Sequence, residues 1–305
     1  MPELPEVETI AQQLNQALKG LKITQIEVLN RKNFLGLTNE AIGLRVEEVS
    51  RRAKIILLKL SSTKYLAIHL KLTGQLIFRK KLKIESPESG EFCNQKDGPF
   101  AVCELPNKFT TVIIGFDDGS KLYFNDLRKF GWIKIIDSRL KVKGEKLETG
   151  GKLDEALGLE RLGPEANDEK TFTLDYFRTV LSKSKKPIKL VVMDQEKLAG
   201  VGNIYANEAL FEAGIRPTRP ASSLEDEEVR KLRYSILRIL KEAIKNKGTS
   251  DRDEAYRQIS GEKGNFQKFL QVYGRKGKEC PQCGGLIKRI AVGGRGTFYC
   301  ENCQI

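Results

Sequence analysis

The sequence predicts an α+β protein of several domains. An N-terminal helix and an antiparallel β-sandwich come first, followed by a helical domain and a cysteine-rich β-hairpin. Three observations predict this order. Apolar residues alternate in short runs up to about residue 137, they recur with a helical period from Leu162 onward, and four of the six cysteines lie between residues 280 and 303. We expect the domains over 1–137, 161–262 and 263–305, joined by a Lys-, Gly- and Glu-rich hinge over 138–160.

The first helix is predicted from Pro5 to near Gly20. Proline suits a first helical turn, and the acids Glu6 and Glu8 favour the positive end of the helix dipole. An apolar stripe then follows at helical spacing, formed by Val7, Ile10, Leu14 and Leu18.

Short alternating runs after this helix predict the strands of the sandwich. They contain Ile23–Val28, Val46–Val49, Ile55–Leu58, Leu66–Leu72, Val112–Ile114, Leu122–Phe124 and Trp132–Ile135. Asp118-Gly119 is a strong hairpin turn between two of them. Residues 81–108 are polar, and we expect a long loop or a hairpin extension there, in which Cys93 and Cys103 are free thiols.

Four helical segments are expected in the next domain: Phe172–Leu181, Ile188–Met193, Tyr205–Phe211 and Leu224–Asn246. The last has the strongest signals, because Ser222 and Glu225 form a capping-box pattern ahead of it and Gly248 suits its end. Two turns rich in glycine separate the helices on either side of residue 200, so the arrangement is helix, two turns, helix.

Composition limits the function classes. The 305 residues carry a net charge of +13, which indicates a polyanionic partner, most simply nucleic acid. A ribosomal or membrane-surface protein would show the same excess. No apolar run reaches transmembrane length, and we expect a cytoplasmic protein. The single histidine, His69, excludes a histidine-rich catalytic metal site.

The cysteines near the C-terminus predict a metal site. Cys280 and Cys283 form one Cys-x-x-Cys pair, Cys300 and Cys303 form another, and sixteen residues separate the pairs. Four thiolates complete a tetrahedral zinc shell, so one structural Zn²⁺ is expected. Between the pairs the pattern is strand, Gly-Gly turn, strand, which is a zinc ribbon with Arg295 at its tip. The ribbon fits either a folding staple with a solvated arginine or, given the charge, an arginine that reaches into DNA.

The N-terminus carries a candidate nucleophile. Removal of Met1 before a small residue would leave Pro2 with a free secondary amine. An α-amino group has a reference pKa near 8, so an appreciable fraction is neutral at about pH 7 and can attack an electrophilic carbon. Glu3 and Glu6 lie close enough in sequence to move protons beside it. The alternative is that this stretch is only the approach to a helix.

Three further motifs suit nucleic acid but have simpler alternatives. The run Gly200–Glu208 places Asn203 at a helix start, where free N–H groups attract phosphate, although alone it is better explained as a helix connector. Adjacent Arg128 and Lys129 next to Phe130 combine cations with a ring that can wedge into a base stack, unless Phe130 is buried. Lys54 ends a basic stretch, Arg51–Lys54, that enters a strand.

Together these residues resemble the formamidopyrimidine-DNA glycosylase family, bacterial base-excision enzymes for oxidised purines. The resemblance covers nearly the whole chain, and the motifs stand in the same order. They are the Pro-Glu-Leu-Pro-Glu start, Arg-Arg-Ala-Lys, His-Leu-x-x-Thr-Gly, Arg-Lys-Phe-Gly, Leu-Gly-Pro-Glu, Gly-Val-Gly-Asn-Ile-Tyr, Val-Tyr-Gly-Arg, the four cysteines and Cys-Gln. Leu4 favours this branch over the related endonuclease VIII branch, where glycine is usual.

The resemblance implies a catalytic group of Pro2, Glu3, Glu6 and Lys54. Pro2 would displace the damaged base at C1′ and form an iminium link to the sugar. Glu3 would act as general acid and base at the ribose, and Glu6 would help hold the N-terminus. Loss of both flanking phosphates by β,δ-elimination would then cut the strand. The expected partner is duplex DNA with oxidised bases or abasic sites, and the expected state is a monomer.

The resemblance also implies a set of DNA contacts. Lys54, Asn203 and Arg295 would clamp phosphates, and Lys189 would lie near the extruded base. Leu72 would fill the hole left by that base, Arg128 would contact the orphaned cytosine, and Phe130 would wedge the opposite stack. His69 and Lys129 are expected to contact DNA as well. Leu72 stands where a methionine is common in the family; the two side chains have similar volume, so we expect the wedge to work.

Two other functions stay open on the sequence alone. One is an endonuclease VIII-like enzyme that prefers oxidised pyrimidines. The other is a zinc-ribbon protein that binds damaged DNA without cutting it.

Overall fold

A computed structural model describes residues 2–81, 104–143, 146–149, 155, 157–250 and 256–305. The predicted thiols Cys93 and Cys103, and most of the predicted loop over 81–108, lie outside these residues. The chain forms two compact units, each described by itself below. The first comprises Pro2, Glu6–Glu160 and Lys247–Asn265; the second comprises Glu3–Pro5, Arg161–Asn246 and Phe266–Ile305. The domain boundaries expected from the sequence stay a prediction.

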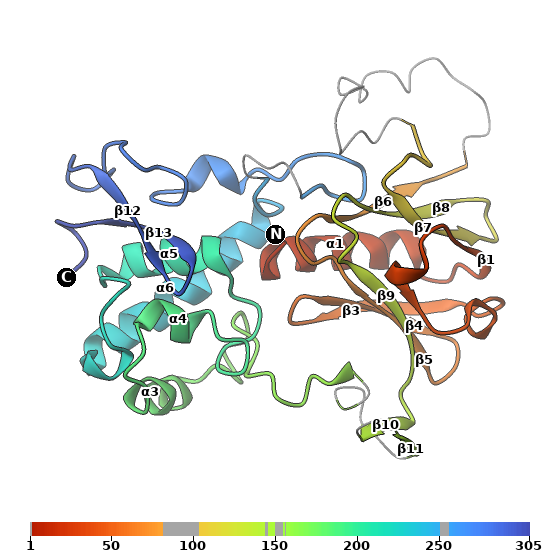
Figure 1. The fold of residues 1–305 in the computed structure, drawn as a ribbon, viewed down its shortest axis with the longest axis horizontal. Helices are drawn as coiled ribbons and strands as arrows, with labels where there is room; N and C mark the ends of the chain where they lie inside the picture. The colour runs from red at the N-terminus through yellow and green to blue at the C-terminus, as the bar shows by residue number, and fades with distance from the viewer. Residues whose placement is uncertain (1, 82–103, 144–145, 150–154, 156, 251–255) are drawn as a thin grey trace. The chain divides into compact units, whose positions relative to one another are not determined.

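Two sheets make up most of the first unit (Figure 1). One has the order β1 (Ile23–Val28), β7 (Thr110–Phe116), β8 (Lys121–Asp126), β6 (Gly74–Arg79). The other has the order β2 (Phe34–Leu35), β9 (Trp132–Asp137), β5 (Lys64–His69), β4 (Ile55–Leu60), β3 (Val46–Arg52). All neighbouring strands are antiparallel except β2 and β9.

A single hydrophobic core joins the two sheets to α1 (Leu4–Leu18). The predicted stripe on α1 supplies four of its members, Val7, Ile10, Leu14 and Leu18, each at most 1% exposed. Residues of both sheets supply most of the others, as expected when each strand turns one face inward. The predicted β-sandwich with an N-terminal helix is therefore confirmed.

Two details of the first unit differ from the sequence prediction. The run Leu66–Leu72 was expected as one strand, but β5 ends at His69 and residues 71–73 form a turn into β6. The prediction was wrong here because Leu70 and Leu72 continue the alternation of apolar residues although the strand has already ended. Lys71, within the turn, adopts a positive φ of 53°. The strand β6 itself was not anticipated.

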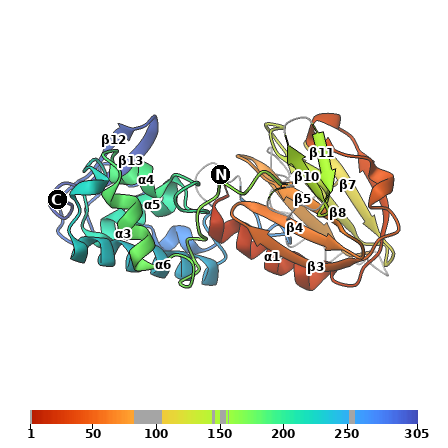
Figure 2. The same ribbon diagram turned by 90° about the horizontal axis from the view of Figure 1, so that it is seen from below.

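Helices form most of the second unit. They are α3 (Leu174–Ser182), α4 (Ile188–Val192), α5 (Asn203–Ala213) and α6 (Asp226–Lys245), and α3 lies beside α6 (Figure 2). The capping box of α6 pairs Glu225 with Glu228, so the predicted Ser222–Glu225 box was wrong by three residues. Ser222 lies instead in a short 3-10 helix ahead of α6.

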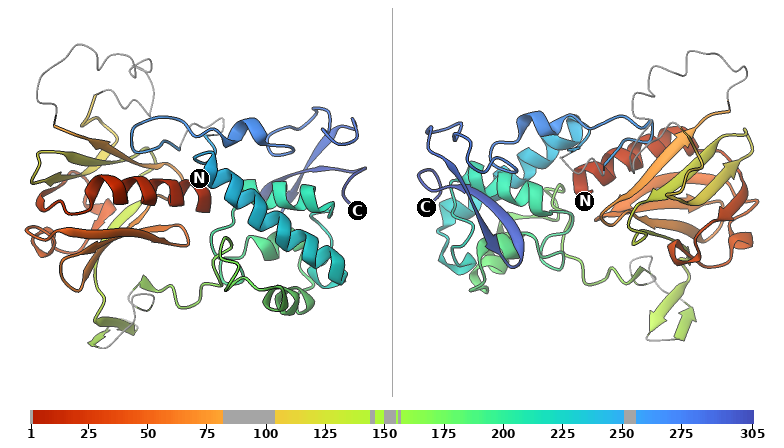
Figure 3. Two further views of the ribbon diagram at one scale, coloured as in Figure 1. Left: turned by 180° about the vertical axis from the view of Figure 1, so that it is seen from behind. Right: turned by 45° about the horizontal axis from the view of Figure 1, so that its top comes forward.

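The C-terminal hairpin consists of β12 (Ile287–Val292) and β13 (Arg295–Cys300), as predicted for the ribbon. Gly293 and Gly294 join the strands with φ of 55° and 72°, the two positive values that a tight type I′ hairpin turn requires. β13 lies beside α5 (Figure 3).

The remaining elements are short. They are the antiparallel pair β10 (Leu140–Lys143) and β11 (Lys146–Thr149), and the 3-10 helices η1 (Arg31–Asn33), η2 (Thr38–Glu40), η4 (Ala221–Ser223) and η5 (Phe266–Phe269). In the described part of the chain no helix is both long and apolar enough to cross a membrane.

Candidate functional site

Glu3 lies at the N-terminus of α5. Its side chain is 2% exposed, and its Oε1 accepts a hydrogen bond from the Ile204 N–H at 2.9 Å. The first N–H groups of a helix have no partner within the helix and carry partial positive charge, so they suit a carboxylate. A group able to take and return a proton is thus held one residue after the predicted nucleophile.

The glycine-rich loop ahead of α5 is shaped by this N-terminal segment. A Cβ on Gly202 would lie 2.2 Å from Glu3 Cδ, and one on Gly200 would lie 2.4 Å from Leu4 Cδ1. The backbone of the loop also pairs with the segment, because the Leu4 N–H donates to the Gly200 carbonyl at 3.1 Å. Sequence reasoning associated these glycines with phosphate; the structure shows that they make room for residues 3 and 4.

Pro2 and Glu6 flank this segment in the sequence, and both are buried. The Glu6 carboxylate, 1% exposed, accepts a hydrogen bond from the Thr249 N–H at 2.7 Å. Gly248 passes so close that a Cβ there would lie 2.8 Å from Glu6 Oε1. Glu6 therefore holds residues 248–249 of the first unit against α1.

Lys54 lies in the turn between β3 and β4. The turn is tight: Ala53 has a positive φ of 51°, and its carbonyl accepts from Arg51 Nη1 at 2.9 Å. Arg51 in turn forms an ion pair with Glu8 of α1 at 2.8 Å. Lys54 is only 9% exposed although it carries a charge, and Ile55, next to it, pairs with His69 across the sheet.

His69 is held as a neutral imidazole. Burial, and after it the charges of Lys71 and Lys54, together lower its pKa to about 3. Its Nδ1 accepts a hydrogen bond from the Lys71 N–H at 2.9 Å. The proton of the neutral ring is therefore on Nε2, which leaves that atom as a donor.

The loops that carry Leu72 and Arg128 are joined by one carboxylate. Asp126 Oδ1 accepts from Thr73 Oγ1 at 2.5 Å and from the Arg128 N–H at 3.1 Å, while its Oδ2 accepts from the Gly131 N–H at 2.7 Å. Asp126 is 1% exposed. The structure thus brings two predicted DNA-contact segments, distant in sequence, to the same end of the sandwich.

The Arg128–Phe130 segment is presented to solvent. Phe130 is 58% exposed, so the alternative that it is a buried strand residue is wrong. The Arg128 guanidinium lies 5.2 Å from the centre of the Phe130 ring, and Lys129 between them adopts a positive φ of 56°. An exposed ring with two adjacent cations, on the connection between β8 and β9, is suited to stacking on a base next to phosphates.

A second group of predicted contacts meets at the start of β13. Asn203 Nδ2 donates to the Gly296 carbonyl at 3.1 Å. Lys189 Nζ donates to the same carbonyl at 3.0 Å and to Thr297 Oγ1 at 2.7 Å. Arg295, directly before these residues, is exposed.

Lys189 is completely buried in this group. Burial lowers its pKa to about 7, while Glu3 acts to raise it and Arg295 to lower it. Its amine is directed into the ribbon, and its predicted role beside an extruded base stays a prediction.

The four cysteines fit one zinc ion. Their Sγ atoms all lie within 4.8 Å of one another, with Cys280 to Cys303 at 3.8 Å and Cys283 to Cys300 at 3.4 Å. Four sulfurs bound tetrahedrally at about 2.3 Å from zinc lie roughly 3.8 Å apart. The ribbon is therefore a closed structural zinc site with no open position for chemistry.

Sequence reasoning missed three residues that organise these sites: Asp126, Asn207 and Glu208. All three are polar and nearly unexposed, at 1%, 0% and 3%. The signal was available, because a buried polar side chain needs a partner. The partners, however, are mostly backbone groups, which no motif displays, and several of them lie far away in sequence: Thr73 for Asp126, Phe298 for Asn207 and residues 271–273 for Glu208.

Comparisons with known proteins agree with this arrangement. Three family models match: the formamidopyrimidine-DNA glycosylase N-terminal domain over residues 1–133, the H2TH domain of the same enzymes over 162–254, and a zinc finger found in FPG and IleRS over 277–305. A formamidopyrimidine-DNA glycosylase from Pelotomaculum thermopropionicum is 38% identical over all of this chain and 99% of its own length.

Solved structures show the same likeness. The crystal structure of MutM (Fpg) from Thermus thermophilus has a TM-score of 0.80 and 36% identity, covering 99% of this chain and 98% of its own. Lactococcus lactis Fpg, solved in complex with DNA that contains an abasic site, has a TM-score of 0.80 and 31% identity, covering 99% of both chains. The chain described here therefore belongs to the formamidopyrimidine-DNA glycosylase family.

Proposed function

We propose that this protein is a bifunctional DNA glycosylase and abasic-site lyase of base-excision repair. It removes oxidised purines, 8-oxoguanine and formamidopyrimidines, from duplex DNA and cuts the strand at the resulting site. The observation that carries the proposal is the placement of Glu3: a buried carboxylate held by the start of α5, one residue after Pro2. Relatives solved with abasic-site and Fapy-dG DNA support the substrate class.

The chemistry starts at the amine of Pro2 once Met1 has been removed. The nitrogen lone pair forms a bond to C1′ of the damaged nucleoside, and the glycosidic bond breaks with its electron pair leaving on the base, which takes up a proton. Glu3 protonates the ring oxygen of the sugar as the ring opens to an iminium ion. β-Elimination then removes a proton from C2′ and breaks the 3′ C–O bond, and δ-elimination removes a proton from C4′ and breaks the 5′ C–O bond. Each phosphate leaves with the electron pair of its C–O bond, and water releases Pro2 from the sugar remnant.

The remaining site residues would hold the DNA. Lys54, Asn203 and Arg295 bind phosphates near the lesion, and His69 adds a neutral N–H donor. Leu72, Arg128 and Phe130 occupy the space beside the orphaned base, which offsets part of the few kcal/mol needed to take a nucleotide out of the stack. Lys189 lies on the side of the extruded base. The partner is duplex DNA, the protein acts as a monomer, and we place it in the bacterial cytoplasm with the nucleoid.

Borohydride trapping on an 8-oxoguanine:C duplex tests the proposal. The reductant converts an iminium ion into a stable amine, so a covalent protein–DNA adduct is expected. A form with an uncleaved N-terminal extension, in which the Pro2 nitrogen is an amide, should give no adduct, and proteolytic removal of the extension should restore it. Absence of an adduct with correctly processed protein would refute the enzyme and leave a DNA-binding function.

Substrate preference needs a second measurement. Excision from 8-oxoguanine:C is expected to be faster than from thymine glycol:A. The reverse order would assign the protein to oxidised pyrimidines, the specificity of the endonuclease VIII branch.

A further inference from the structure

The zinc ribbon is docked on the helical part of its own unit by polar side chains that bind ribbon backbone. Three of them reach three consecutive residues directly after Arg295. Asn203 donates to the Gly296 carbonyl, Lys189 donates to Thr297 Oγ1, and Asn207 Oδ1 accepts from the Phe298 N–H at 2.8 Å.

Asn207 is the residue of this set that nothing in the proposed chemistry uses. It lies in the middle of α5 with 0% exposure. Its Nδ2 donates to the carbonyl of Asn203, one turn earlier, at 2.5 Å. One amide therefore contacts both the residue that begins α5 and the strand that begins with Arg295.

Glu208, the next residue of α5, holds a second part of the ribbon unit. Its carboxylate accepts three backbone hydrogen bonds: from Gln271 at 2.8 Å, Val272 at 3.1 Å and Tyr273 at 2.7 Å. These residues lead into the ribbon, and the Tyr273 ring packs on Phe298 with 5.2 Å between ring centres.

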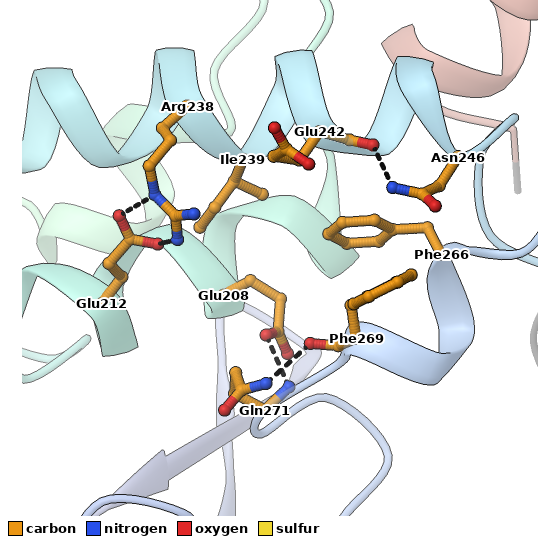
Figure 4. Close-up of a pocket in the computed structure, with 9 residues that line it drawn as sticks. All are labelled: Glu208, Glu212, Arg238, Ile239, Glu242, Asn246, Phe266, Phe269 and Gln271. Atoms are coloured by element: carbon orange, nitrogen blue, oxygen red, sulfur yellow. Dashed lines mark hydrogen bonds and ion pairs between the residues drawn. The ribbon is translucent and has the colours of Figure 1, made fainter.

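Figure 4 shows Glu208 directed at this segment from the wall of a cavity of about 200 Å³. Glu212, which also lines the cavity, instead forms an ion pair with Arg238.

Burying the polar side chains of Asn207 and Glu208 lowers the stability of the fold unless their hydrogen bonds compensate for the lost contact with water. An unpaired buried amide or carboxylate destabilises a fold, and apolar residues would suit the interior of α5 equally well. Burial raises the pKa of Glu208, and the backbone N–H groups of Tyr273, Gln271 and Val272 counter that shift. Asn207 accepts from the backbone of β13, and Glu208 accepts from the backbone that leads into the ribbon, so their contacts define where the ribbon lies on α5.

We propose that Asn207 and Glu208 are positioning residues, which fix the ribbon on α5 so that Arg295 keeps one position relative to Asn203 and the Glu3 carboxylate. The residues proposed to bind phosphate, Asn203 and Arg295, and the carboxylate of Glu3 are then all held in place by the first turn of α5. This inference rests on the proposed function, because it assigns Arg295 and Asn203 to phosphates.

Two variants test the inference. Asn207→Leu keeps the size of the side chain and removes the hydrogen bonds of its amide. Glu208→Gln turns an NH₂ group toward N–H donors. Each should raise Kd for a duplex with a reduced abasic site roughly tenfold. The cleavage rate at saturating abasic-site DNA should stay within about twofold, because Pro2 and Glu3 are untouched. Glu212→Gln, one turn further along α5, is the matched control and should bind normally, because the ion pair of Glu212 is with Arg238 and does not involve the ribbon.

A double-mutant cycle with Arg295→Ala distinguishes an effect of Asn207 on the position of Arg295 from a general disturbance of the protein structure. If Asn207 acts through Arg295, then Asn207→Leu should weaken binding less than about twofold once Arg295 is gone. Full additivity, or a lower saturating rate with unchanged Kd, would overturn the inference.

If Asn207→Leu does not fold, by zinc content and thermal melting, Glu208→Gln decides the matter: normal affinity in Glu208→Gln would then overturn the inference. The cycle uses binding alone, so it can be read even if trapping shows no adduct and the proposed chemistry fails.

Discussion

The charge state of His69 is set by burial and by the neighbouring cations Lys71 and Lys54, which together lower its pKa to about 3. In the unfolded chain the pKa is about 6.5. Between these values the unfolded state binds one more proton than the folded state, so stability rises with pH across this window and is lost as the pH falls. Since the chain has no other histidine, and most carboxylates titrate below pH 5, the interval from pH 7 to pH 5 reports His69.

We therefore expect the first unit to lose about 1–2 kcal/mol of unfolding free energy between pH 7 and pH 5. His69→Asn keeps an acceptor for the Lys71 N–H and cannot be protonated, so most of this loss should disappear. Urea unfolding followed by the fluorescence of Trp132, the single tryptophan, measures it; the Trp132 ring lies 5.6 Å from that of His69. An equal pH dependence in the variant would contradict the assignment.

Gly202 gives a second prediction for a single residue. Gly202→Ala would place a methyl group 2.2 Å from Glu3 Cδ, so the carboxylate must leave the start of α5. Because a displacement of about 1 Å in a catalytic group can cost 100-fold in rate, single-turnover cleavage of an abasic-site duplex should fall by roughly that factor. Gly115→Ala is the control: its Cβ would meet the nearest atom at 3.6 Å. A normal rate in Gly202→Ala would show that Glu3 need not lie there.

At the scale of the element, Asp126 connects the turn before β6 to the segment after β8. Asp126→Ala removes the acceptors of Thr73, Arg128 and Gly131, and it leaves the buried N–H of Gly131 without its partner. We expect a loss of about 1–3 kcal/mol of stability. We also expect weaker binding of abasic-site duplex, because the segments with Leu72 and Phe130 are no longer held together.

Asp118→Ala is the matched control for this prediction. Asp118 accepts from the Ser120 N–H at the other end of β8, in the turn that joins it to β7. Its loss should reduce the urea midpoint without changing DNA affinity. Equal effects of both variants on affinity would show that Asp126 acts on the whole sandwich and has no special role at these loops.

The elements that could be predicted from sequence are those whose signal is local. The stripe of α1, the Asp118-Gly119 turn and the Cys-x-x-Cys pairs each lie within a few residues, and the structure has them where expected. The Gly200–Gly202 loop shows the limit. Its glycines were visible, but the groups that require them, Glu3 and Leu4, come some two hundred residues earlier. A contact across such a distance follows only from the tertiary fold.

At the scale of the whole molecule, the two units separate the expected roles. The first carries Lys54, His69 and the exposed Phe130; the second carries Glu3, Asn203 and the ribbon. The net charge of +13 suits a polyanionic partner, and under the proposed function both units would contact its phosphates. Each group should therefore contribute separately to affinity, and loss of the ribbon should leave the first unit intact.

Removal of zinc tests this separation. Without the metal the four thiolates no longer cross-link the ribbon, which is too small to fold on a hydrophobic core alone, so Arg295 loses its support. Affinity for an abasic-site duplex should then fall at least tenfold, and the slope of log K against log salt should become shallower by about one, the value for one lost phosphate contact. Arg295→Ala with zinc retained should reproduce the change in slope. The urea midpoint reported by Trp132 should not move, since that residue lies in the first unit; a shifted midpoint, or unchanged affinity after chelation, would show that the ribbon is not a separate DNA-binding part.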